Sequence, residues 1–185
     1  MKKKVLFIDR DGTLILETHN FKIDAPDQIV YYPDIFPWLT KIAEMGFELV
    51  LVTNQDGLGT PEFPDEPFFS THKMIMNSFT EKGIHFSKEF IDRTFPEDNQ
   101  PTRKPGTGML TEYFSEAYDL PNSYVIGDRI TDVMLAKNLG CQCFWLNDGR
   151  NLGATEIVET SATLQPFIAL ETRYWREIYE FLSKK

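Results

Sequence analysis

Several short apolar segments, each followed directly by polar or acidic residues, constrain the fold of this chain more than any other feature of its sequence. Residues 5–8 and 124–126 are rich in β-branched and aromatic side chains, and the acids Asp9 and Asp128 follow them closely. Runs of this length and composition predict buried strands. The predicted strands are residues 5–8, 48–52, 124–126 and 143–146, with a weaker one within 86–95.

Segments with helical spacing of apolar residues separate these strands. The predicted helices cover residues 35–45, 72–82, 109–117 and 133–139, with a loop over 56–69 and Asp34 as the first N-cap. Alternation of helices with short apolar strands predicts an α/β fold with a doubly wound parallel sheet, covered by helices on both faces. Ligands bind such sheets beyond the carboxyl ends of the strands, so the polar groups there are expected to converge.

Length, charge and cysteine spacing narrow the class of protein. The chain has 185 residues, which suits one domain, and its net charge of −9 disfavours nucleic acid as a partner. No apolar run approaches the ~20 residues of a membrane-spanning helix, so we expect no membrane contact and a small-molecule ligand. Cys141 and Cys143 flank one residue of an apolar segment, too close for an ordinary disulfide, which predicts buried thiols in a reducing, cytoplasmic compartment.

Asp9 and Asp11 are the first candidate catalytic residues. They lie two positions apart directly after the first predicted strand, and Gly12 follows them. A carboxylate such as Asp9 can attack phosphorus, and a second one, Asp11, can carry a proton to the leaving oxygen. An isolated pair of this kind is usually a solvated acidic turn, but the strand before it and the polar clusters later in the chain favour a catalytic role.

A cation is needed to hold two carboxylates and a phosphate dianion close together, because all of them repel one another. Mg²⁺ prefers hard oxygen ligands. The candidate ligands are the Asp9 carboxylate, the Asp11 carbonyl and Asp128 after a distant strand, with Asp132 one helical turn further on, binding directly or through water. Asp128 also stands where it could cap the following helix.

Thr53 and Lys104 are candidates for binding the phosphoryl oxygens. Thr53 follows the second predicted strand, and Lys104 lies in the polar connection over residues 96–106. A hydroxyl and an ammonium group can neutralise and orient those oxygens during transfer. Either residue alone would be unremarkable, and their order along the chain between the two acidic clusters is what favours this role.

In this order, these groups resemble the four motifs of the haloacid dehalogenase superfamily. The matching positions are residues 9–13, Thr53 with Asn54, Lys104, and residues 127–128 with Asp132. The resemblance covers about residues 3–147. It implies a Rossmann-like core, a nucleophilic Asp9, an acid and base at Asp11, phosphate contacts from Thr53, Asn54 and Lys104, and Mg²⁺. The short segment from Leu14 to Thr53 predicts small loop insertions and no large cap domain.

Within that superfamily the chain resembles the histidinol-phosphatase domains of histidine biosynthesis. The similar segments are residues 7–15, 53–60, 103–105 and 123–132. The resemblance implies hydrolysis of L-histidinol phosphate and makes Arg10 and Gln55 candidate substrate-binding residues. The heptose-bisphosphate phosphatases share several of these residues but usually differ after Gln55, and they are the alternative.

Glu17 and Asp56 are candidate specificity residues. Histidinol phosphate carries a cationic amine, and these two acids follow Asp9 and Thr53 by a few positions. Either could face the organic part of the substrate or be a solvated loop acid.

The loop before Lys104 departs from the family pattern. Many members carry a structural zinc there, held by cysteines and a histidine. In this chain Asp92, Thr94, Gln100 and Thr102 stand at about those positions, so we expect no structural zinc.

The remaining predictions concern the domain organisation and rival functions. We expect a phosphatase domain over residues 1–165 and a C-terminal strand and helix extension over 166–185. That extension resembles the segment that joins the phosphatase to an imidazoleglycerol-phosphate dehydratase in bifunctional proteins. A non-catalytic phosphate-binding module is a less favoured reading, because every residue that the chemistry needs is present. A phosphotransferase or mutase remains open, since these motifs do not specify the acceptor.

Overall fold

The computed structural model describes residues 2–150 and 152–185, and its core is one six-stranded parallel sheet. The strands are β1 (Val5–Ile8), β2 (Glu48–Asn54), β3 (Phe86–Asp92), β4 (Tyr124–Gly127), β5 (Gln142–Trp145) and β6 (Ile168–Glu171). Their order across the sheet is β3-β2-β1-β4-β5-β6, which is that of a doubly wound fold. The predicted fold class is confirmed, and the strand order reverses between β1 and β4.

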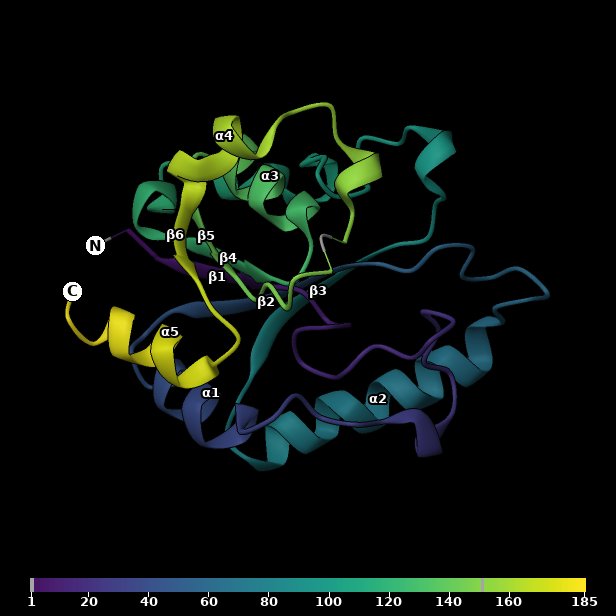
Figure 1. Ribbon diagram of the computed structural model, residues 1–185. Coiled ribbons are helices and arrows are strands. Elements are labelled where there is room, and N and C mark those ends of the chain that lie inside the picture. The colour runs from purple at the N-terminus through teal and green to yellow at the C-terminus, as the bar shows by residue number, and fades with distance from the viewer. Residues whose placement is uncertain (1, 151) are drawn as a thin grey trace.

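Helices cover both faces of this sheet (Figure 1). On one side lie α1 (Ile35–Ala43), α2 (Asp65–Glu81) and α5 (Trp175–Leu182), and on the other lie α3 (Ile130–Leu139) and α4 (Ser161–Leu164). Short 3₁₀ helices complete the connections, at Pro26–Gln28, Pro96–Asp98, Gly108–Phe114, Leu120–Asn122, Ala154–Glu156 and Gln165–Phe167.

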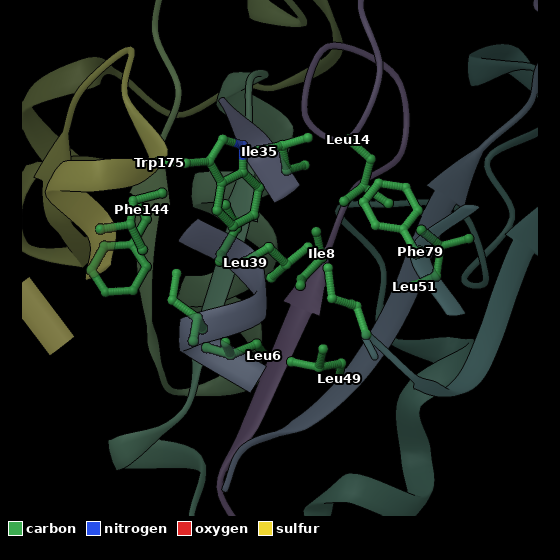
Figure 2. Packing of buried hydrophobic residues seen from close by; sticks show 14 of the residues in the cluster. Leu6, Ile8, Leu14, Ile35, Leu39, Leu49, Leu51, Phe79, Phe144 and Trp175 are labelled. Atoms are coloured by element: carbon green, nitrogen blue, oxygen red, sulfur yellow. The ribbon is translucent and has the colours of Figure 1, made fainter. Parts of the chain in front are cut away.

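The central strand β1 shows how the sheet divides the core. Leu6 and Ile8 pack with the helices of the first side, whereas Val5 and Phe7 pack with α3 on the second. Figure 2 shows the first of these clusters, in which the strand residues meet α1 and α5. Because both faces of β1 are buried, its sequence is apolar throughout rather than alternating.

The two cysteines belong to the second cluster. Both thiols are free and buried, and Cys143 lies within β5. Burial raises the pKa of the Cys141 thiol to about 12, so this group stays protonated and acts as an apolar packing residue.

The helix predicted over residues 72–82 is longer than the sequence indicated, because α2 begins at Asp65. Pro64 precedes the helix in an extended conformation, and the acids Asp65 and Glu66 occupy the first turn, where the helix dipole favours them. Phe68 in that turn packs against Phe63. The aromatic residues of the predicted loop therefore pack into a local cluster. Their spacing does not follow a helical period, so the sequence pattern did not indicate the start of the helix.

Of two further local predictions, one was wrong and one was confirmed in its position. The segment over residues 109–117 is not an α-helix but a 3₁₀ helix at Gly108–Phe114, with Leu110 outside helical geometry. Its start is tied to a neighbouring turn, because the Gly108 N–H donates to the Pro101 carbonyl at 2.8 Å. Asp34 does stand at the N-cap of α1, but with a φ of 56° its side chain makes no capping hydrogen bond.

The predicted C-terminal strand and helix are integrated into the same sheet and core. β6 pairs with β5, and Trp175 and Ile178 of α5 belong to the first core cluster. The Trp175 indole N–H also donates to the Thr13 carbonyl at 3.2 Å, immediately after the Asp9 loop. The boundary that we placed between residues 165 and 166 therefore does not separate two units of structure.

No large cap domain is inserted in the described chain. The connection from β1 to β2 holds one 3₁₀ helix and α1, and that from β2 to β3 holds a loop and α2. Among the described residues, no helix is long and apolar enough to cross a membrane.

We predict that Trp175→Ala lowers the free energy of unfolding by about 3–5 kcal/mol, since it leaves a cavity and an unpaired carbonyl below the Asp9 loop. Chemical denaturation measures the change. Tyr174→Ala is the matched control, because this neighbouring ring is mostly exposed and its loss should cost less than about 0.5 kcal/mol. Equal losses in the two variants would contradict the role of Trp175.

Candidate active site

A cavity of about 290 Å³ opens beyond the carboxyl ends of the central strands. Asp9 follows β1, Thr53 lies near the end of β2, and both line the cavity with Asp11 and Lys104. The strand order reverses between β1 and β4, so the cavity lies at the topological switch point. Segments far apart in the sequence meet there, as the sequence predicted.

The Lys104 ammonium group links two carboxylates at the base of the cavity. Its Nζ lies 2.8 Å from Asp9 Oδ1 and 2.8 Å from Asp132 Oδ1, and all three side chains are almost fully buried. Burial opposes the charged form of Lys104, but the charges of Asp132 and Asp9 outweigh it and raise its pKa. Lys104 is therefore a permanent cation next to the candidate nucleophile.

Asp132 is fully engaged by the protein. Its Oδ1 accepts from Lys104 Nζ, and its Oδ2 accepts from the Arg129 N–H at 3.1 Å. Burial and the nearby Asp9 charge raise the pKa of Asp132 to about 6, although Lys104 acts in the opposite direction. With both oxygens occupied, Asp132 serves better to hold Lys104 than to bind an ion directly.

Asp128 shows the opposite pattern. Both of its carboxylate oxygens are buried and have no hydrogen-bond partner among the described residues. Burial, reinforced by Asp9 and Asp132, raises the pKa of Asp128 well above its ordinary value. A Cβ atom at Gly12 would stand 2.2 Å from Asp128 Oδ2, so only glycine lets the two loops approach this closely.

These carboxylates fit a divalent cation. One carboxylate oxygen from each of Asp9, Asp128 and Asp132 lies within 4.8 Å of the other two. Within the described chain, neither oxygen of Asp128 has a hydrogen-bond partner. A buried carboxylate without hydrogen bonds is costly unless a cation meets it. An all-oxygen set suits Mg²⁺.

Asp11 is oriented by Gln55 and Arg10, two of the residues that we predicted to bind the substrate. Gln55 Nε2 donates to Asp11 Oδ2 at 2.6 Å, and Arg10 Nη1 donates to Asp11 Oδ1 at 3.2 Å. Arg10 is fully buried, with its guanidinium over the Phe68 ring, and neither Arg10 nor Gln55 lines the cavity. Both therefore position the Asp11 carboxylate, and their contact with substrate stays a prediction.

Thr53 and Asn54 differ in whether they keep a polar group free to contact a ligand in the cavity. Thr53 Oγ1 accepts from Gln55 Nε2 at 2.9 Å, which leaves its hydroxyl proton for a ligand in the cavity. Asn54 donates to the Lys104 carbonyl and accepts from the Lys104 N–H, both at 3.0 Å. Although Asn54 lines the cavity, its amide is used to hold the Lys104 backbone.

Glu17 and Asp56 both line the cavity, and each is paired with an arginine. Arg129 Nη2 lies 2.5 Å from Glu17 Oε1, and Arg103 lies 2.5 and 3.3 Å from the two Asp56 oxygens. Asp56 is at the exposed rim. The Glu17 side chain is buried, which raises its pKa against the lowering by Arg129. Its Oε2 makes no hydrogen bond among the described residues but lies 3.6 Å from Arg150 Nη1.

Glu156 is a member of this rim that sequence reasoning missed. It lies 2.8 Å from Arg103 and 3.9 Å from Arg129, so one carboxylate joins the two arginine pairs. The two arginines flank predicted site residues and could have been found from that position. Glu156 lies in the connection after β5, where the sequence carries no motif.

The loop that leads to Lys104 is ordered by Asp92, the last residue of β3. Its Oδ1 accepts from the Thr94 N–H at 2.8 Å and the Thr94 hydroxyl at 2.5 Å, and its Oδ2 accepts from the Thr102 hydroxyl at 2.6 Å. The carboxylate is buried, and Asp92 pairs in register with Asn54. These hydrogen bonds join both ends of the loop. The absence of zinc stays a prediction, which metal analysis tests.

Known proteins share this sequence and arrangement. A family model described as HAD-hydrolase-like matches residues 101–165. Two proteins named histidine biosynthesis bifunctional protein HisB are similar over nearly the whole chain: that of Spirosoma linguale at 46% identity and that of Bacteroides fragilis at 47%. The chain belongs to the haloacid dehalogenase superfamily of phosphatases. The two matches include 97% and 98% of this chain but only 48% of the length of each relative.

Solved structures of haloacid dehalogenase phosphatases share the fold. A D,D-heptose 1,7-bisphosphate phosphatase from B. bronchiseptica, complexed with magnesium and phosphate, has a TM-score of 0.79 at 22% identity and covers 98% of each chain. A second such phosphatase, from Burkholderia thailandensis, has a TM-score of 0.58 at 21% identity, covering 99% of this chain and 100% of that chain. At these identities the similarity establishes the fold alone.

We predict that Asp128→Asn abolishes stabilisation by Mg²⁺ while making the metal-free protein more stable at neutral pH. The folded state holds the Asp128 proton more tightly than the unfolded state does. Its contribution to stability therefore falls as the pH rises from an ordinary pKa of about 4 towards the raised folded value. The amide removes that penalty.

Thermal unfolding with and without Mg²⁺ measures both effects. At about 100 times its dissociation constant the ion should stabilise the wild type by about 2.7 kcal/mol. Asp27→Asn, which neutralises an exposed carboxylate, is the control and should behave as the wild type. A normal Mg²⁺ response in Asp128→Asn would contradict the assignment.

We also predict that Thr102→Val and Asp92→Asn lower both stability and kcat, because each loosens the loop that carries Lys104. Losing one hydrogen bond should cost Thr102→Val about 1 kcal/mol, and Asp92→Asn about 1–3 kcal/mol. Thr111→Val changes an exposed threonine of the nearby 3₁₀ helix and is the matched control. Unfolding curves and turnover of a generic phosphomonoester are the measurements, and wild-type values for Asp92→Asn would refute the role.

Proposed function

We propose that the chain hydrolyses L-histidinol phosphate to L-histidinol and inorganic phosphate, through an aspartyl-phosphate formed on Asp9. The observation that carries this proposal is the combination at one cavity of a buried Asp9 beside Lys104 with a buried Glu17, whose Oε2 makes no hydrogen bond among the described residues. The first pair suits phosphoryl transfer, and the second residue suits an amine-bearing substrate. The similarity to bifunctional histidine-biosynthesis proteins supports the same reaction.

In the first step a carboxylate oxygen of Asp9 attacks phosphorus and the bond from phosphorus to the substrate oxygen breaks. Asp11 donates its proton to that oxygen, and histidinol leaves. Gln55 and Arg10 hold the Asp11 carboxyl from below, so that it faces the cavity. In the second step Asp11 takes a proton from water, the water oxygen attacks the acyl-phosphate, and phosphate and free Asp9 result.

Lys104 and Thr53 stabilise the charge on the transferred group. The ammonium at 2.8 Å from Asp9 is placed to meet a phosphoryl oxygen during attack, and the Thr53 hydroxyl can donate to another. A Mg²⁺ ion held by Asp9 and Asp128 would supply further neutralisation of the phosphate. Asn54 and Asp132 act indirectly, because they fix the backbone and the side chain of Lys104.

The charges around the cavity favour histidinol phosphate over a bisphosphorylated sugar. A second phosphate would need cations of its own, but Arg103 and Arg129 are already paired with the carboxylates of Asp56, Glu156 and Glu17. Lys22, whose ammonium group donates to the Glu62 carbonyl, also lines the cavity. Glu17 Oε2, which makes no hydrogen bond among the described residues and lies 3.6 Å from Arg150 Nη1, can instead accept from the substrate amine. We expect Asp56 to contribute less, since both of its oxygens are bound by Arg103 at the exposed rim.

The chain spans about half the length of the bifunctional relatives that it matches. We propose that its phosphatase activity is one half of such a bifunctional protein. The other half would then be an imidazoleglycerol-phosphate dehydratase, because the C-terminal segment resembles the one that joins the two enzymes in bifunctional proteins. A cytoplasmic location fits this role and stays a prediction.

The test is a comparison of kcat/KM for L-histidinol phosphate, heptose 1,7-bisphosphate and glycerol phosphate in the presence of Mg²⁺. We expect histidinol phosphate to be preferred by about 100-fold or more, which equals about 2.7 kcal/mol of transition-state binding. Asp9→Asn should show no turnover of any substrate, because its amide is no anionic nucleophile. Preference for the heptose bisphosphate would overturn the substrate assignment, and an active Asp9→Asn would overturn the mechanism.

A further inference from the structure

We propose that Phe21 and Phe95 form an aromatic clamp at the mouth of the cavity, which selects substrates whose organic part is a planar ring. This inference rests on the proposed function, because it assigns residues to the ring of the substrate rather than to its phosphate or amine. The two side chains come from separate loops, one after β1 and one after β3, and both line the cavity that holds Asp9.

The Phe21 side chain is 53% exposed and belongs to none of the buried clusters of the described chain. Its φ is 57°, a left-handed conformation that is costly for a bulky residue. Side chains of the same loop maintain this conformation: the Thr18 hydroxyl donates to the Lys22 carbonyl at 2.9 Å. A ring that core packing does not need is thus held in an unfavourable backbone geometry facing the cavity.

Phe95 is placed by a contact with a glycine. A Cβ atom at Gly57 would stand 2.5 Å from Cζ of the Phe95 ring, so the ring lies directly on the Gly57 backbone. The Gly57 N–H donates to the Arg93 carbonyl at 3.1 Å, which joins the two loops beneath the ring. Phe95 nevertheless remains 41% exposed and also lies outside the buried clusters.

Exposed aromatic faces beside a polar site favour a planar partner. A heteroaromatic ring can stack on such a face or meet it edge to face, and a protonated ring gains a cation–π contribution as well. A polyhydroxylated chain would instead desolvate its hydroxyl groups against carbon. Arg129 lies 5.5 Å from the Phe21 centroid and is itself paired with Glu17, so the ring is next to the carboxylate proposed for the amine.

The experiment measures kcat and KM of Phe21→Leu and Phe95→Leu on two ethyl phosphates that differ only in their ring, one imidazol-4-yl and one cyclohexyl. Leucine keeps the apolar bulk but loses the planar face. For the imidazolyl substrate we expect KM to rise about 2- to 10-fold in each variant with kcat nearly unchanged, while the cyclohexyl substrate changes little. Phe21→Tyr, which keeps a planar ring, should retain the wild-type preference for the imidazolyl substrate.

Phe114→Leu is the control, since Phe114 is about as exposed as Phe21 but does not line the cavity. An equal loss for both ring types, or wild-type selectivity in both leucine variants, would overturn the clamp. Failure of the proposed function has a separate signature: the wild type would not prefer histidinol phosphate to glycerol phosphate. The paired ring substrates report on the clamp in either case.

Discussion

The repulsion among three buried carboxylates is the constraint on which the rest of this structure depends. Asp9, Asp128 and Asp132 bring oxygens within 4.8 Å of one another, in surroundings where like charges are poorly screened. Lys104 offsets part of that repulsion by bridging Asp9 and Asp132, but it leaves Asp128 without a hydrogen-bond partner among the described residues. The site is therefore electrostatically incomplete as the protein alone builds it. A divalent cation beside Asp128 would offset the negative charge that Lys104 leaves unbalanced.

Holding that arrangement requires rigid supports, and the doubly wound sheet supplies them. Asp9 and Asp128 directly follow buried strands, and Asp132 lies in the first turn of α3. These segments can approach because Gly12 and Gly127 carry no Cβ; at Gly127 a Cβ would stand 2.1 Å from Asp132 Oδ2. Lys104, by contrast, comes from a connection without a strand beneath it. Its position depends on the amide of Asn54, which pairs with the Lys104 backbone, and on the hydrogen bonds of Asp92. Asn54 and Asp92 lie opposite each other at the ends of β2 and β3. Lys104 is thus attached to the sheet by hydrogen bonds from side chains rather than by following directly from a strand.

This division explains how much could be predicted from the sequence. The strands, their parallel arrangement and the meeting of Asp9, Thr53 and Asp128 follow from apolar runs that end in polar residues, since sheet topology alone brings strand ends together. The start of α2 was missed because Phe68 serves a local aromatic cluster rather than a helical stripe. The resemblance to the histidinol-phosphatase domains made Arg10 and Gln55 candidates for binding substrate, yet their side chains turn inwards to Asp11. Neighbours in sequence share a location, but alternate residues at a strand end face different directions, and only packing decides which.

Glu156 shows where sequence reasoning has no signal at all, and it also shows how specificity can change while chemistry is conserved. Its carboxylate reaches Arg103 and Arg129 from a connection that contributes nothing to the catalytic groups. The sheet fixes the residues that act on phosphorus, whereas the charges and rings around the organic part of the ligand come from loops that meet only above the sheet. Because those loops are joined to one another by arginine–carboxylate pairs, replacing one acid would release an arginine and make the rim more favourable for an anion. A single charge on a loop can therefore redirect the substrate class without disturbing the buried carboxylates beneath.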